Sequence, residues 1–254
     1  MIIKKAVEQV IDSGVKPVVL DAQRVVNFSN ETEGIRTSLV IKSLELGVLT
    51  ANQYRIVARR TEQGSRLVER NIEKLFYFYQ ALKKEFASAK FFTVSVYARA
   101  LLNGVLLQML EGFFRQYPYV NAGTICLELS ADILFEDIFT YKKELDKVKQ
   151  LGVKIALCEV GQEFCPLLRL GEIDYDLVFL DDYFISSLND ESKTNEINGV
   201  MSIINNRPTK IYASCVAQEI VPLLETIGAD GYTFAQDETL ENKEWRVGGK
   251  LEWA

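Results

Sequence analysis

Two pairs of residues with polar side chains follow short apolar runs in the second half of the chain. Cys158-Glu159 comes directly after Val153–Leu157, and Asp181-Asp182 comes directly after Leu177–Leu180. A short apolar run that ends in polar groups is typical of a buried parallel strand that brings side chains to one end of a sheet. In α/β proteins this carboxyl-terminal edge is where ligands bind and reactions occur. Carboxylates at such an edge can bind a metal ion or transfer protons, so these residues are the first candidates for a functional site.

The chain contains no histidine, and this limits the chemistry that it can perform. A histidine general base, a Ser-His-Asp triad and a zinc site with histidine ligands are all excluded. Catalysis would have to use carboxylates, lysine, tyrosine, cysteine or a metal ion held by oxygen ligands. The four cysteines form no CxxC pair and lie in or beside apolar runs: Cys126, Cys158, Cys165 and Cys215. This placement is typical of buried free thiols in a reducing compartment, and a redox or metal-binding role of Cys158 and Cys215 is the alternative.

The composition is that of a soluble globular protein, because 48% of the 254 residues are apolar and 25% are charged. No window of the sequence is long and apolar enough for a membrane helix, and the first residues lack a signal-peptide core. These features favour a cytoplasmic location. The net charge of −6 argues against direct nucleic-acid binding, because proteins that bind nucleic acids carry a basic surface.

One basic cluster is a local exception to the acidic charge. Four arginines flank an expected turn at Gln63 and Gly64, namely Arg59, Arg60, Arg66 and Arg70. Such a group is typical of a solvated helix face near a loop. The alternative is a patch that binds an anion or a partner protein.

Eight apolar or β-branched runs alternate with helical patterns along most of the chain. The runs are Pro17–Leu20, Thr37–Ile41, Phe91–Val96, Thr124–Leu129, Val153–Leu157, Leu177–Leu180, Lys210–Ala213 and Gly231–Phe234. The helical patterns cover Ser65–Phe86, Ala98–Tyr117, Phe135–Leu151 and Ala217–Ile227, and the last two of these end at Gly152 and Gly228. Eight strands separated mostly by helices predict an α/β protein with a single TIM-like (β/α) barrel, and a doubly wound sheet is the alternative.

The start of the chain departs from this alternation. Between the first two runs lies no helical pattern, only the polar segment around Asn27–Gly34. A hairpin at this segment would make the first strand antiparallel to the second, so we expect an irregular, partly antiparallel start of the barrel. No linker divides the sequence, and residues 1–254 are therefore predicted to form one domain, with a core at about 16–236 and a C-terminal tail at 237–254.

The order and spacing of five segments resemble those of the EAL domain. The segments are LELGVLTANQYRIVAR (Leu44–Arg59), FFTVSVYARALL (Phe91–Leu102), ICLELS (Ile125–Ser130), LGVKIALCEVG (Leu151–Gly161) and VFLDDYFI (Val178–Ile185). The resemblance runs from about Pro17 to Phe234. Active members of this family hydrolyse the second messenger cyclic di-GMP with two divalent cations, on a TIM-like barrel with a partly antiparallel start. The resemblance therefore implies this fold, with a site at the barrel mouth where Mg²⁺ or Mn²⁺ would activate a water and hold the phosphodiester.

The first ligands of that site are replaced in this sequence. The resemblance places the signature Glu-Ala-Leu on Arg36-Thr37-Ser38, so a cation stands where a metal-binding carboxylate is expected. The arginine that grips a phosphate falls on Val40, and the asparagine ligand of the SVN pattern falls on Tyr97. The segment upstream is several residues longer than in the family, but no nearby register restores Glu-Ala-Leu.

The later motifs show further losses. The resemblance places the two aspartates of the DDFG pattern on Cys158 and Glu159, and the lysine of the KID pattern on Phe179. It places the glutamates of the AEGVE pattern on Ser214 and Ala217, and the glutamine of the QGY pattern on Asp230. Carboxylates remain at corresponding places in Glu128, Glu159 and Asp181. A metal ion, if one binds, would have to use these three residues.

The resemblance thus predicts an EAL-like domain that is catalytically inactive, needs no cofactor and acts as a signalling or regulatory module through protein contacts. We expect Arg36 to occupy the vacant metal position and to pair with Glu128 or Glu159. One alternative is a receptor that binds cyclic di-GMP without hydrolysing it. Another is a weakly active phosphodiesterase that holds Mg²⁺ or Mn²⁺ on the three remaining carboxylates. An unrelated barrel enzyme, with Tyr97 or Cys158 as proton donor or nucleophile, is the last.

The sequence does not identify the protein partner. Related domains often pair through helices near the DDFG strand, so a homodimer is a candidate assembly, with Phe164, Leu167 and Leu168 as its candidate contact. The same side chains are consistent with packing against the barrel. Cyclic di-GMP is not the favoured ligand, because Ser38 and Val40 replace residues that the resemblance assigns to nucleotide binding. No membrane and no direct nucleic-acid contact is expected.

Overall fold

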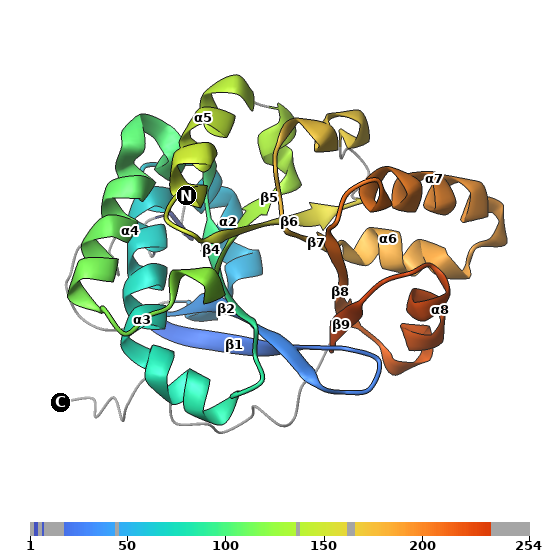
Figure 1. Cartoon of the computed structure of the whole chain (residues 1–254), viewed down its shortest axis with the longest axis horizontal. Helices are drawn as coiled ribbons and strands as arrows, with labels where there is room; N and C mark the ends of the chain where they lie inside the picture. Colours follow the sequence, from blue (N-terminus) through green and yellow to red (C-terminus); the bar gives the residue numbers. More distant parts are fainter. Residues whose placement is uncertain are drawn as a thin grey trace.

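The computed structural model describes residues 3–4, 7, 18–43, 46–135, 138–161 and 166–234. In these residues nine strands form one sheet that closes on itself, and helices surround it (Figure 1). The strands are β1 (Val18–Val26), β2 (Thr32–Ser43), β3 (Gly47–Leu49), β4 (Phe91–Val96), β5 (Ile125–Ser130), β6 (Lys154–Val160), β7 (Leu177–Leu180), β8 (Lys210–Val216) and β9 (Gly231–Phe234). Their order is β1-β9-β8-β7-β6-β5-β4-β2-β3, and β1 also pairs with β2. This pairing closes a barrel of eight strands with β3 outside it, and the predicted TIM-like α/β barrel is confirmed.

The barrel begins with an antiparallel hairpin, as the sequence predicts. β1 pairs with β2 along its whole length, and residues 27–31 form the turn between them. The side-chain oxygen of Asn27 accepts hydrogen bonds from the backbone N–H groups of Ser29 (3.0 Å) and Glu31 (2.9 Å), which is how asparagine stabilises tight turns. β1 meets β9 antiparallel at Val26 and Tyr232, whereas the pairs from β2–β4 to β8–β9 are parallel.

Some strand boundaries differ from the prediction. β4, β7 and β9 coincide with predicted runs, but both hairpin strands are longer than the runs Pro17–Leu20 and Thr37–Ile41. The added residues mix polar side chains with apolar ones, so they lie outside the continuous apolar runs on which the prediction was based. β3 is absent from the prediction, because its three residues are too few to give a periodic signal.

Helices cover the outside of the barrel, with α3, α4 and α5 on one side and α6, α7 and α8 on the other (Figure 1). The α-helices are α2 (Ala51–Arg60), α3 (Gln63–Glu85), α4 (Val105–Gln116), α5 (Ile138–Lys149), α6 (Asp182–Ser186), α7 (Thr194–Asn205) and α8 (Val221–Thr226). Short 3-10 helices are η1 (Ala98–Gly104), η2 (Ala122–Thr124), η3 (Ala131–Phe135), η4 (Leu167–Glu172), η5 (Ser187–Asn189), η6 (Glu191–Lys193) and η7 (Gln218–Ile220). α2, α6 and α7 have no counterpart in the predicted patterns.

The predicted helix Ala98–Tyr117 is wrong in its first part, where η1 takes its place. Asn103 (φ 57°) and Gly104 (φ 71°) adopt left-handed conformations, which interrupt an α-helix. The two predicted helix stops are confirmed, because Gly152 (φ 89°) and Gly228 (φ 82°) have the left-handed conformation typical of glycine after a helix.

Apolar and aromatic side chains fill the interior of the barrel. They form one buried cluster of Val25, Phe91, Cys126, Ala156, Cys158, Leu177, Phe179 and Tyr212. The ring of Tyr212 contacts the rings of Phe91 and Phe179, with 5.7 Å between the ring centroids in each pair. Cys126 and Cys158 are buried free thiols, as predicted. This cluster is the floor on which the barrel mouth is built.

Several expectations concern residues outside this description. They are Phe164, Cys165, the side chain of Cys215 and the tail at 237–254. Within the described ranges, no helix is both long and apolar enough to cross a bilayer.

Gly34 of β2 leaves room for the ring of Phe91. A Cβ atom at Gly34 would lie 2.3 Å from two ring carbons of Phe91, whose side chain is buried. We expect Gly34→Ala to lower the free energy of unfolding by about 1–3 kcal/mol, because the packed ring cannot move away. Gly112→Ala is the matched control, since nothing lies within 4 Å of its Cβ position and alanine favours helix α4 by roughly 1 kcal/mol. Urea denaturation measures both, and a stable Gly34→Ala protein would contradict this account of the barrel interior.

Candidate functional site at the barrel mouth

Side chains at the carboxyl ends of the parallel strands line a cavity of about 530 Å³. Parallel strands deliver their last residues to the same edge of the barrel, and β1 and α2 complete the wall. The lining residues that can ionise or hydrogen-bond through their side chains include Asp21, Gln23, Arg36, Ser38, Arg55, Arg59, Tyr97, Glu128, Ser130, Cys158, Glu159, Asp181, Asp182 and Ser214.

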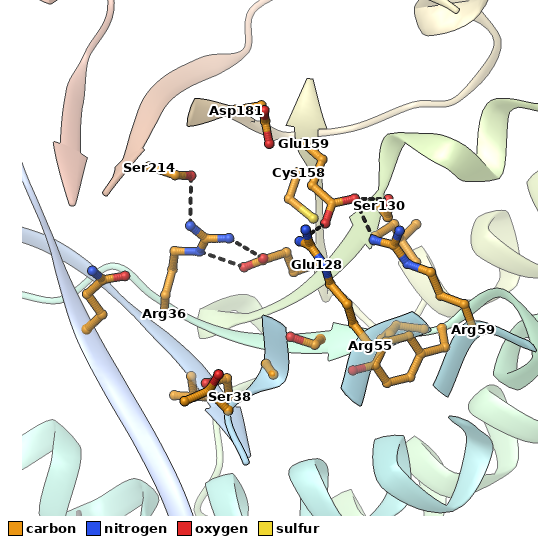
Figure 2. A pocket seen from close by; sticks show the side chains of 18 of the residues that line it. Arg36, Ser38, Arg55, Arg59, Glu128, Ser130, Cys158, Glu159, Asp181 and Ser214 are labelled. Carbon is orange, nitrogen blue, oxygen red and sulfur yellow. Dashed lines mark hydrogen bonds and ion pairs between the residues drawn. The ribbon is translucent and has the colours of Figure 1, made fainter. Parts of the chain in front are cut away.

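The guanidinium group of Arg36 donates three hydrogen bonds at the centre of this mouth (Figure 2). Its Nε donates to Oε2 of Glu128 at 3.0 Å, and its Nη2 donates to Oε1 of the same carboxylate. Its Nη1 donates to Oγ of Ser214 at 2.8 Å. The pair is largely removed from solvent, with 19% of the Arg36 side chain and 7% of the Glu128 side chain exposed. The expected pairing of Arg36 is therefore present, and Glu128 is its partner.

Phe179 supports this ion pair from below. The guanidinium carbon of Arg36 lies 4.3 Å from the centroid of the Phe179 ring, which is the geometry of a cation–π contact. Phe179 itself is fully buried and belongs to the floor, not to the lining of the cavity. Phe179 stands where the resemblance assigns a lysine, and its ring packs against the guanidinium group of Arg36.

Glu159 is the second paired carboxylate of the mouth (Figure 2). Arg55 donates to its Oε1, and Arg59 and the hydroxyl of Ser130 donate to its Oε2. Burial alone would raise the pKa of Glu159, but Arg59, the hydrogen bond from Ser130 and Arg55 together lower it below its usual range. The carboxylate is therefore held in its charged form by groups of α2 and β5.

Cys158 and Tyr97 are poorly suited to catalysis. Burial, followed by the charges of Glu128 and Glu159, raises the pKa of the Cys158 thiol well above its usual value, so the thiol stays protonated. Burial also raises the pKa of Tyr97, although Arg59 opposes this, and its side chain is hydrogen-bonded with that of Tyr54. These states count against an unrelated barrel enzyme that uses either residue as proton donor or nucleophile.

Asp181 and Asp182 lie on the rim of the mouth. Asp181 accepts a hydrogen bond from the backbone N–H of Tyr183 at 2.9 Å and so caps the start of α6. Burial and the neighbouring charge of Asp181 raise the pKa of Asp182. Ser38 also lines the cavity, as expected.

Four predicted positions do not line the cavity, and Phe179 in the floor is one of them. Val40 is half-buried in β2 beyond the lining, and Ala217 is exposed after β8. Asp230 lies at the opposite end of the barrel, where it pairs with Lys210 and accepts a hydrogen bond from the N–H of Ile211 at 2.8 Å. Its placement at the mouth is wrong, because the residue that precedes a parallel strand lies at the amino-terminal edge of the sheet.

The sequence prediction missed Arg55, and it named Arg59 only as part of the basic cluster, not as a residue of the barrel mouth. Both arginines lie four positions apart on α2 and therefore on one face of that helix. The signal for α2 is the pattern of Thr50 followed by Gln53, whose Oε1 accepts a hydrogen bond from the N–H of Thr50 at 2.8 Å. The other three arginines of the basic cluster do not line the cavity, in agreement with a solvated helix face.

The carboxylates of the mouth do not fit divalent cations as they stand. Both oxygens of Glu128 and both oxygens of Glu159 accept hydrogen bonds from arginines, and Asp181 caps a helix. In the part of the chain that the structure describes, no three acidic or cysteine side chains lie close enough together to hold a metal ion. A cation on Glu128, Glu159 and Asp181 would first have to displace the guanidinium groups.

A closed α/β barrel with a charged cavity at the carboxyl ends of its strands places the protein in the class of TIM-like barrels. Within this class the chain belongs to the EAL domain family, whose model matches residues 15–234. Among curated proteins, Rv1354c of Mycobacterium tuberculosis is 23% identical over 127 residues, which are 50% of this chain and 20% of that protein. Protein y4lL of Sinorhizobium fredii is 26% identical over 117 residues, 46% of this chain and 14% of that protein. The chain thus matches a fifth or less of the length of these relatives, both of which are described as uncharacterized.

Solved structures share the fold at low sequence identity. The PaMucR phosphodiesterase, in complex with c-di-GMP, superposes with a TM-score of 0.76 at 16% identity, covering 92% of this chain and 95% of that one. The FimX EAL domain gives 0.77 at 12% identity, with 92% and 93% covered. An EAL domain protein from Listeria monocytogenes gives 0.74 at 17% identity, with 92% and 90% covered.

The burial of the Arg36–Glu128 pair predicts a large effect on stability. We expect Arg36→Ala to lower the free energy of unfolding by about 3–5 kcal/mol, because Glu128 would remain buried without its counter-ion. Arg70→Ala is the control, since Arg70 pairs with Glu73 through side chains that are 44% and 41% exposed, and its loss should cost less than about 1 kcal/mol. Urea denaturation compares the two variants. Equal losses would contradict the role of Arg36 as the counter-ion of the mouth.

Proposed function

We propose that this EAL domain does not hydrolyse cyclic di-GMP and acts as a regulatory module through protein contacts. The observation that carries the proposal is the bidentate pair of Arg36 and Glu128, because it occupies a carboxylate that the resemblance assigns to metal binding. Glu159, a second such carboxylate, is likewise paired with Arg55 and Arg59.

Electrostatics make recruitment of two cations unfavourable. A metal ion at Glu128 would face the positive charge of Arg36, and displacement of Arg36 would break a largely buried ion pair. The buried ring of Phe179 offers no hydrogen bond with which to orient a water molecule. The same features count against a weakly active phosphodiesterase that uses the remaining carboxylates.

Exposed apolar side chains support a role in protein contacts. Leu168 is 92% exposed and Phe139 is 77% exposed, whereas Leu167 packs against the core. Leu168 belongs to the candidate contact of a homodimer, and an apolar side chain so exposed is a suitable anchor for a second copy or for another protein. The partner and a cytoplasmic location both stay predictions.

A cyclic di-GMP receptor without hydrolysis is the second candidate. The cavity of about 530 Å³ at the mouth favours it, since a pocket of this size is typical of small-molecule sites. Similar structures were solved with the nucleotide bound, including the PaMucR phosphodiesterase.

The first test is turnover. We expect no hydrolysis of cyclic di-GMP by the purified protein with Mg²⁺ or with Mn²⁺, measured by chromatography of the nucleotide products. The PaMucR phosphodiesterase is the positive control in the same buffers. Hydrolysis above the rate in protein-free buffer would overturn the proposal, provided that Arg36→Ala changes this rate and so assigns it to the mouth.

The second test is binding. We expect isothermal titration calorimetry with cyclic di-GMP to give no binding heat, with or without a divalent cation. Binding without turnover would contradict the leading proposal and support the receptor.

A further inference from the structure

Three hydrogen-bond donors from two separate elements converge on the carboxylate of Glu159. Arg55 and Arg59 reach it from α2, and Ser130 reaches it from the end of β5. Two guanidinium groups and a hydroxyl are the donor set with which proteins bind a phosphate group, because planar guanidinium groups match the geometry of its oxygens. The donors that now bind the carboxylate of Glu159 could therefore also bind an anion from solution.

The backbone of Glu159 is strained in this position. Its φ of 61° lies in the left-handed region, which glutamate rarely adopts. The register of β6 with β7 shifts between Leu157 and Val160, and this bulge re-aims the residues between them. Glu159 thus lies in a bulge with an unfavourable backbone conformation, directly beside the two arginines.

Both arginines can be reached from the cavity. Their side chains are 36% exposed for Arg55 and 26% exposed for Arg59, while that of Glu159 is 11% exposed. All three line the cavity of about 530 Å³, so a ligand there would meet the guanidinium groups as soon as Glu159 moved aside.

We propose that Arg55, Arg59 and Ser130 form a binding subsite for a phosphate group, which Glu159 blocks from within the chain. This subsite is separate from the Arg36–Glu128 pair, and it does not depend on whether the domain acts through protein contacts. Asp182 interacts electrostatically with Arg55 and opposes an anion on that side. Arg59 and Ser130, which share one oxygen of Glu159, are therefore the stronger half of the subsite.

The test is to remove the internal charge without changing the shape of the side chain. In Glu159→Gln the amide keeps the size of the carboxylate but no longer forms ion pairs, so both arginines become available. Calorimetric titration with inorganic phosphate should then give a Kd at least tenfold lower than that of the wild-type protein. Phosphate binding by Glu159→Gln that is no tighter than by the wild type would overturn the proposal.

Two double variants locate the binding. Glu159→Gln with Arg59→Gln should lose at least tenfold in phosphate affinity relative to Glu159→Gln alone. Glu159→Gln with Arg70→Gln is the matched control and should bind as Glu159→Gln does, because Arg70 lies outside the cavity on α3. Equal losses in both double variants would indicate a general charge effect and would contradict the subsite.

Thermal unfolding provides a readout that tolerates a less stable variant. Phosphate should raise the Tm of Glu159→Gln by more than that of the wild type, and equal shifts would overturn the proposal. Titration of Glu159→Gln with cyclic di-GMP distinguishes two sources of the phosphate group. Binding of both ligands supports a subsite for the phosphodiester, and binding of inorganic phosphate alone supports a subsite for a free phosphate.

Discussion

The structure of the barrel mouth depends on one buried charge, the carboxylate of Glu128. A carboxylate with 7% of its side chain exposed is stable only with a counter-charge, and Arg36 supplies it through both oxygens. The same guanidinium reaches Ser214, so a single group connects β2, β5 and β8. The chain itself thus provides the positive charge around which the mouth is arranged.

The aromatic floor and this ion pair belong together. Phe179 gives the guanidinium a flat, negatively polarised surface at 4.3 Å, and Tyr212 and Phe91 continue the packing beneath it. An aliphatic side chain at position 179 would fill space but would not attract a cation. Residues far apart in the sequence therefore form one contact network, in which Arg36 pairs with Glu128 and packs on Phe179, and Phe179 packs on Tyr212.

The fold could be predicted because apolar runs and glycine stops repeat along the chain. The resemblance to the EAL domain placed Arg36 opposite Glu128 and Glu159, but it could not decide between them, and the structure shows Glu128 as the partner. The partners of Glu159 could not be predicted. Ser130 lies at the end of β5, and the two arginines come from α2, where the burial of Tyr54 and Ala58 decides which face of the helix carries Arg55 and Arg59 over the cavity. The misplacement of Asp230 has a similar origin, since a motif gives order along the chain but not the end of the strand at which a residue lies.

The closure of the barrel has a consequence for the order in which the molecule folds. β1 and β9 meet at Val26 and Tyr232, and Gln23 bonds to the carbonyl of Phe234 across 211 residues of sequence. Contacts between such distant segments form late, because a long loop must be ordered before they are made. Arg36 and Glu128 lie on β2 and β5, so their pair can form while the sheet is still open and chain synthesis continues. The contacts of Arg36 with Phe179 on β7 and with Ser214 on β8 are completed only when these later strands join the sheet.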